Sequence, residues 1–190
     1  MEIKNNVLLR VEESDVSIEG EINIPDGVTE IKGHAFGCWC KTLRKITIPN
    51  SVTEIGGCSF YGCKFLEEVT IPNGVPKIGR GTFSGCESLK KITLPDSITE
   101  IEEGAFYGCK SLKEITIPDG VTEIKQGTFS GCKSLRKIII LNNMTSIEKY
   151  AFDHCESLQQ ITFASKTYSI KEKDYRLLTE AGQEGIKHFL

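Results

Sequence analysis

Two cysteines separated by a single tryptophan are the residues of this chain whose types and spacing come nearest to a chemical site. Cys38, Trp39 and Cys40 stand in the stretch HAFGCWCKTLRK, and His34 lies four residues before Cys38. Thiolate sulfur and imidazole nitrogen are common zinc ligands, and paired cysteines also support thiol–disulfide exchange. Whether these side chains can converge depends on the structural elements that position them.

Composition and charge exclude several classes of protein. The chain has 190 residues, a length that suits one domain, with 39% hydrophobic residues and a net charge of −3. This balance gives no indication of a nucleic-acid partner. The sequence also has no apolar run of roughly 18 residues, the length that a membrane-spanning helix needs, so we expect no insertion into a membrane. The first residues, MEIKNNVLLRVEESDV, do not form a signal peptide. We therefore expect a cytoplasmic protein as written, or a secreted or cell-surface protein if a leader has been removed.

The chain is dominated by an internal repeat of 23 residues. A representative copy is IPDGVTEIKQGTFSGCKSLRKII, which begins at Ile117. Six copies cover residues 24–162, and the first of them has 24 residues. The phenylalanine column is Phe36, Phe60, Phe83, Phe106, Phe129 and Phe152, and the cysteine column is Cys40, Cys63, Cys86, Cys109, Cys132 and Cys155. Each copy can bury its few apolar side chains only against its neighbours, which predicts a solenoid.

The local pattern within each copy predicts one short strand followed by turns. Segments such as LKEITIP alternate around β-branched residues, so the isoleucines of ITI face the core and the threonine faces outward. The next residues, PDG or PNS, favour a turn because proline fixes φ and Asp or Asn bonds to its own backbone. VTEI then continues as an extended segment, and GAFYGC leaves room for one short helical or 3₁₀ turn.

The repeat resembles a known family. The pattern IP-x-x-VT-x-I-x-x-x-AF-x-GC-x-x-L-x-x-I is similar to the BspA-like class of bacterial leucine-rich repeats and covers about three quarters of the chain. The resemblance implies a leucine-rich-repeat solenoid with a parallel β-sheet on its concave face. It also implies a non-enzymatic protein that binds other proteins, often at the bacterial surface in adhesion.

A solenoid needs caps that protect its terminal turns from water and from pairing with other chains. Residues 1–23 predict an N-terminal cap in the form of a β-hairpin, with two strands joined at ESD. Residues 163–190 predict a half repeat, with Ile170 placed 23 residues after Ile147, and then a short helical cap with Asp174 at its N-cap. The alternative for the tail is a docking segment.

The repeat changes how the cysteine motif is interpreted. Cys40 belongs to the cysteine column, which predicts a ladder of reduced, buried thiols, whereas Cys38 lies in the one-residue insertion of the first repeat. A zinc site would have to bring His34, Cys38 and Cys58 together, and we favour instead a distorted loop with Trp39 folded over the N-terminal cap or exposed as an aromatic contact. No catalytic group of residues and no phosphate-binding loop is present, so we expect no enzyme activity, no cofactor and no metal.

Two outward columns of the predicted sheet hold the candidate binding residues. One alternates in sign from copy to copy, so that Lys lies beside Glu, and the other is a threonine column interrupted by Ile139 in the apolar run IIIL. At least one side chain of that run should be exposed. The candidate residues on the concave face are Lys45, Thr47, Glu68, Thr70, Lys91, Thr93, Glu114, Thr116, Lys137 and Ile139.

These observations predict a scaffold that recognises a protein partner through this sheet. Three settings remain open: an adhesion-type surface protein, an intracellular interaction module, and an architectural spacer within a larger assembly.

Overall fold

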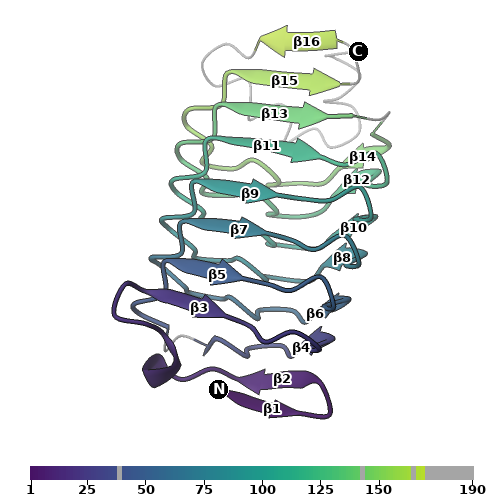
Figure 1. Ribbon diagram of the computed structural model, residues 1–190. Coiled ribbons are helices and arrows are strands. Elements are labelled where there is room, and N and C mark those ends of the chain that lie inside the picture. The colour runs from purple at the N-terminus through teal and green to yellow at the C-terminus, as the bar shows by residue number, and fades with distance from the viewer. Residues whose placement is uncertain (38–39, 142–143, 164–165, 170–190) are drawn as a thin grey trace.

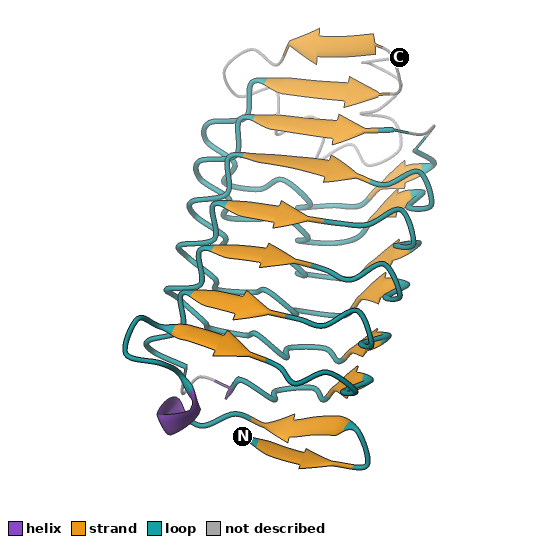
Figure 2. Ribbon diagram, in the orientation of Figure 1, coloured by secondary structure: helices purple, strands orange, loops and turns teal. Residues whose placement is uncertain are grey.

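The chain winds into a parallel-strand solenoid in which each repeat forms one turn (Figure 1). The computed structural model describes residues 1–37, 40–141, 144–163 and 166–169. Nearly all regular structure is β-strand, joined by loops and turns, as Figure 2 shows. One 3₁₀ turn, η1 (Glu13–Asp15), precedes the repeats. Within the described ranges, no helix is long and apolar enough to cross a membrane. The predicted fold class, a leucine-rich-repeat solenoid, is confirmed.

The longer strands of successive turns form the first sheet, in two four-stranded halves. Residues 45–47, 68–70 and 91–93 each form a strand that buries its central β-branched residue and exposes the residues on either side, in keeping with the alternation of a strand. The first half contains β3 (Glu21–Asn23), β5 (Lys45–Thr47), β7 (Glu68–Thr70) and β9 (Lys91–Thr93). The second half contains β11 (Glu114–Ile117), β13 (Lys137–Ile140), β15 (Gln160–Phe163) and β16 (Lys166–Ser169).

The extended VTEI segments form shorter strands on a second side of the solenoid. Within the described chain they belong to three separate ladders, because pairing lapses between β6 and β8 and between β10 and β12. The repeat strands are β4 (Glu30–Ile31), β6 (Glu54–Ile55), β8 (Lys77–Ile78), β10 (Glu100–Ile101), β12 (Glu123–Ile124) and β14 (Ser146–Ile147). The N-terminal strands β1 (Glu2–Lys4) and β2 (Val7–Arg10) extend the first of these ladders.

The core is a set of columns that run through all turns. The phenylalanine rings are fully buried and stack on one another, with centroids 5.2–5.7 Å apart and planes within 5° from Phe60 to Phe152. Phe36, in the repeat with the insertion, is tilted by 30° from Phe60. Such offset stacking adds to the burial of each ring. The extra residue therefore perturbs the stack at its first step only.

One turn position requires a left-handed backbone in all six repeats. Gly81, Gly104 and Gly127 occupy it with φ of 60° to 62°, a conformation that glycine adopts without strain. The other three repeats place His34, Cys58 and Tyr150 there, with φ of 60°, 56° and 61°. The two residues that the sequence linked to a metal site, His34 and Cys58, are therefore side chains held in a backbone position that favours glycine.

Antiparallel strands close the stack at both ends. At the N-terminus, β1 pairs with β2 through Asn5 and Asn6, whose positive φ angles suit a two-residue hairpin turn. The sequence predicted a different hairpin, in which the two strands lie on either side of ESD. That segment forms η1, and its flanking strands β2 and β3 lie in different sheets.

At the other end, β16 turns back and pairs antiparallel with β15, whereas a half repeat had been expected there. A returning strand covers the edge of the last turn, which a further parallel half turn would leave open. Ile170 and the predicted helix after Asp174 lie outside the described residues.

Candidate functional site

All ten candidate residues lie on the outward side of the first sheet, which we call the strand face. Parallel register places Lys45 beside Glu68 and Glu68 beside Lys91, and it places Glu114 beside Lys137. Eight of the ten are exposed, while Lys137 and Ile139 are half-buried. In the apolar run around Ile139, Leu141 is 42% exposed, which confirms that this run leaves an apolar side chain at the surface.

The charged column of the strand face resolves into separate ion pairs. Each glutamate contacts the lysine of the following turn: Lys45 Nζ lies 3.5 Å from Glu21, Lys91 Nζ lies 3.5 Å from Glu68, and Lys137 Nζ lies 3.8 Å from Glu114. Exposed pairs of this kind contribute about 0–1 kcal/mol each. The strand face can therefore exchange these contacts for contacts with a partner at little cost.

The first sheet splits in the middle of the strand face, between β9 and β11. At the neighbouring steps, the Lys90 N–H donates to the carbonyl of Glu67 and the Arg136 N–H to that of Lys113, both at 2.8 Å. No corresponding bond joins Lys113 to Lys90 within the described chain.

The stack nevertheless stays continuous across this split. The turns that contain the phenylalanines form what we call the turn side. There the Phe83 N–H donates to the carbonyl of Ala105 at 2.8 Å, and the centroids of the Phe83 and Phe106 rings lie 5.6 Å apart. The same two turns also lack strand pairing on the second side, between β10 and β12, while the stacked rings keep the core between them closed.

A hollow of about 410 Å³ lies over the split. Backbone and side chains of both strands form it: the lining residues are Lys90, Lys91, Ile92, Thr93, Leu94, Lys113, Glu114, Ile115 and Thr116. Leu94 is half-buried and stands where the other five repeats have isoleucine. Three lysines and one glutamate line the hollow, which leaves an excess of two positive charges. Lys113 forms no ion pair with any described residue.

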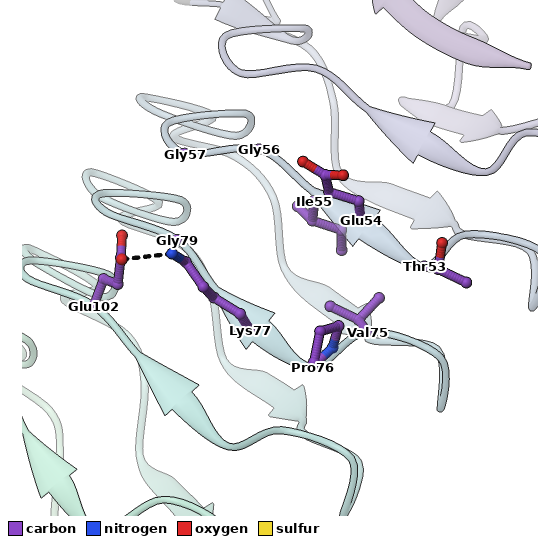
Figure 3. A pocket seen from close by; sticks show the side chains of 10 residues that line it. All are labelled: Thr53, Glu54, Ile55, Gly56, Gly57, Val75, Pro76, Lys77, Gly79 and Glu102. Carbon is purple, nitrogen blue, oxygen red and sulfur yellow. Dashed lines mark ion pairs between the residues drawn. The ribbon is translucent and has the colours of Figure 1, made fainter. Parts of the chain in front are cut away.

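A second hollow, of about 420 Å³, lies on the second side of the solenoid between β6 and β8 (Figure 3). Pro76 stands where the other repeats have threonine, and it has no N–H to donate. The Thr53 and Thr99 N–H groups donate to the turn before them at 2.9 and 2.8 Å, so the proline removes one rung of this ladder. Figure 3 shows Lys77 extending to Glu102, 2.6 Å away, and this hydrogen bond raises the pKa of Lys77.

The cysteine column stacks inside the solenoid, as predicted, and has a role that the sequence did not show. The four thiols from Cys86 to Cys155 each donate a hydrogen bond to a phenylalanine carbonyl of the preceding turn, for example Cys86 to Phe60 and Cys109 to Phe83, both at 3.2 Å. Burial raises the pKa of Cys86 and Cys132 to about 12. The thiols thus stay protonated and act as backbone donors rather than as nucleophiles.

The metal hypothesis for the insertion stays untested, because only His34 and Cys58 of its three residues lie in the described part of the chain. Among the described residues, no group of three or more His, Cys, Asp or Glu side chains could hold a metal ion. His34 is exposed and Cys58 is half-buried. Cys38 and Trp39 lie outside the described residues.

Comparison with known proteins agrees with this geometry. A family described as BspA type leucine rich repeat region matches in 6 copies over residues 14–110 and 55–177. The chain belongs to this family. A leucine-rich repeat protein from Bacteroides ovatus is similar with 33% identity and a TM-score of 0.60, over 76% of this chain and 46% of that one.

Two further solved structures are similar to this chain. The leucine-rich repeat protein of T. pallidum has 26% identity and a TM-score of 0.60, over 82% of this chain and 78% of its own. A protein from Eubacterium ventriosum, with 24% identity and a TM-score of 0.68, shares the fold over 88% of this chain and 48% of its own. This chain thus spans less than half of the Bacteroides ovatus protein. No curated protein matches the chain.

Sequence reasoning missed two residues that line the hollow on the strand face, Lys90 and Lys113. They belong to a column that reads Arg44, Glu67, Lys90, Lys113, Arg136 and Gln159, in which three successive cations were a usable signal. The strands themselves gave no such signal, because β9 and β11 share a buried isoleucine followed by an exposed threonine, Ile92–Thr93 and Ile115–Thr116.

Proposed function

We propose that this protein is a non-enzymatic binding scaffold that recognises a protein partner through the strand face, centred on the hollow between β9 and β11. The observation that carries the proposal is the split: one place on an otherwise paired sheet offers an apolar floor, threonine hydroxyls and excess lysine charge. Protein interfaces combine an apolar centre with a polar rim in this way.

Complementarity over an extended surface supplies the binding energy, and no bond is made or broken. Lys113 is available to pair with a partner carboxylate, whereas Lys91 and Glu114 would first give up their pairs with Glu68 and Lys137. The family resemblance favours a partner at the bacterial surface, as in adhesion. An intracellular interaction module and an architectural spacer are the alternatives.

A charge-swapped variant tests the strand face without changing the net charge. In E68K/K91E/E114K/K137E both ion pairs are rebuilt with reversed polarity, so the free energy of unfolding should change by no more than about 1 kcal/mol. The matched control K133E/E156K swaps the pair between Lys133 and Glu156, 3.5 Å apart, away from the strand face.

The readout is affinity capture from cell and surface fractions, with quantitative mass spectrometry of what each variant retains. We expect proteins held by the wild type and by the control to be lost from the strand-face variant. Equal retention by all three proteins would contradict the strand face as the binding surface, and specific capture of no protein would favour a spacer.

A further inference from the structure

A third hollow, of about 490 Å³, lies on the turn side of the first repeats, away from the strand face. Two aromatic rings and two cationic side chains gather there. We call it the aromatic hollow, and its lining residues are Lys41, Tyr61, Gly62, Lys64, Phe65, Gly85 and Glu87. Neither the stacking of the core nor the proposed strand-face function accounts for this collection of side chains.

The aromatic hollow exists because one residue departs from the repeat. Phe65 occupies a column that otherwise contains only small hydroxyl residues, namely Thr42, Ser88, Ser111, Ser134 and Ser157. Its side chain is 46% exposed, and that of Tyr61 is 49% exposed. The solenoid needs no aromatic residue at either position, since serine serves in later turns. Large exposed apolar groups that the fold does not require are typical of contact surfaces.

Glycines keep the space between the rings open. Gly62 and Gly85 lie in adjacent turns with φ of 72° and 75°, where a side chain would be strained. A Cβ atom at Gly62 would meet no other atom within 4 Å, so the position faces open space. Bare backbone at Gly62 and Gly85 therefore lines the hollow together with the two aromatic side chains.

The charge around the aromatic hollow is positive. Lys41 has no ion pair among the described residues. Lys64 Nζ lies 3.9 Å from Glu87, but Glu87 is held more closely by Lys110, at 2.8 Å. The guanidinium of Arg44 lies 5.9 Å from the centroid of the Phe65 ring and 3.2 Å from Glu67. Lys41 and Lys64 thus remain available to an anionic ligand.

We propose that the aromatic hollow is a second docking site, which binds an acidic peptide segment that presents an aromatic side chain beside carboxylates. The ligand ring would pack against Tyr61 and Phe65, and its carboxylates would meet Lys41 and Lys64. Packing between aromatic rings adds to the burial of each ring, and charge complementarity selects the acidic partner. This site does not depend on the strand face.

The test is an NMR titration of the full chain with a capped tripeptide in which glutamate flanks phenylalanine on both sides. We expect shifts concentrated at residues 61–65 and 85–87. A peptide with lysine in place of glutamate should bind at least about tenfold more weakly, since it reverses the favourable charge. A peptide with alanine in place of phenylalanine should lose affinity comparably, because it cannot pack against the rings.

Repeat-derived substitutions assign the site. F65S and K41E install residues that other turns carry in the same columns, Ser88 and Glu87, so both should fold. Each should weaken the acidic peptide at least about fivefold, in line with the loss of one contact of about 1 kcal/mol. Y107S is the matched control, because Tyr107 is 54% exposed in the Tyr61 column but does not line the hollow.

Three results would overturn the proposal. One is wild-type affinity in both F65S and K41E, another is equal binding of the acidic and basic peptides, and the third is a set of shifts centred on residues 90–94 and 113–116. The last result would place the peptide on the strand face and would support the proposed function while removing the second site.

Discussion

The core columns and the exposed columns of this solenoid come from the same repeat, but they tolerate change to different degrees. Inside, every turn places the same phenylalanine and the same cysteine, and the rings stay within 5° of parallel over five turns. Outside, the strand face alternates in charge, and single turns carry residues that the others lack, such as Phe65 and Pro76.

The difference follows from the number of neighbours that each side chain must satisfy. A buried ring such as Phe106 packs between the phenylalanine rings of the two neighbouring turns, so a change in its shape disturbs both contacts. An exposed side chain meets its neighbours only through weak ion pairs. Function is therefore expected where the exposed columns depart from the repeat, and stability where the core columns do not.

The largest effect should come from breaking the phenylalanine stack. Phe106→Ala leaves a cavity between two closely packed rings and should lower the free energy of unfolding by about 3–5 kcal/mol. Phe65→Ser, at an exposed position where serine is usual, should cost much less. Urea unfolding followed by circular dichroism measures both, and similar losses would contradict the division between core and surface.

Alkaline pH should weaken the core through the cysteine column. The thiols of Cys86 and Cys132 keep their protons in the folded chain to a pKa of about 12, whereas ordinary thiols ionise near 9.0. The unfolded state binds fewer protons between these values, so the free energy of unfolding falls as pH rises. Each buried thiol contributes up to about 1.4 kcal/mol per pH unit to this fall.

Urea unfolding at several pH values above 9 under reducing conditions measures this slope. The double variant C86A/C132A should show a shallower fall than the wild type. An unchanged slope would mean that these thiols do not control alkaline stability.

The smallest effects should come from the left-handed turn position. Gly127→Ala should destabilise the chain by about 1 kcal/mol through φ strain alone, because no atom lies within 4 Å of the added Cβ. Tyr150→Gly, at the equivalent position, should relieve the φ strain and stabilise the folded chain by a few tenths to about 1 kcal/mol. The entropy that glycine adds to the unfolded chain reduces this gain. Thermal unfolding of both variants should shift in opposite directions; shifts of the same sign would be inconsistent with the shared conformation.

The sequence predicted the features that repeat and missed the ones that occur once. The phenylalanine column from Phe36 to Phe152 predicts the solenoid, because each repeat can bury its phenylalanine only against the neighbouring repeats. The β1–β2 hairpin depends on two asparagines with positive φ, a local turn that the repeat pattern cannot indicate. The return of β16 lies beyond the last full repeat, where the periodic pattern gives no information.

The candidate site shows the same limit. The outward columns were predictable from strand alternation, whereas the split between β9 and β11 was not, since Ile92 and Ile115 are both buried and both followed by an exposed threonine. Phe65 was visible in the sequence as a break in a serine column. Its importance became clear only when the structure placed it beside Tyr61 and Lys41.

Amide hydrogen exchange with and without a purified partner tests the central claim most directly. If the strand face is the binding surface, added partner should slow exchange most strongly in residues 90–94 and 113–116, where unpaired strand edges border the hollow. The interior turns around Phe83 and Phe106 should change little, because they are already protected. Protection confined to the second side of the solenoid, with none at β9 and β11, would contradict the account.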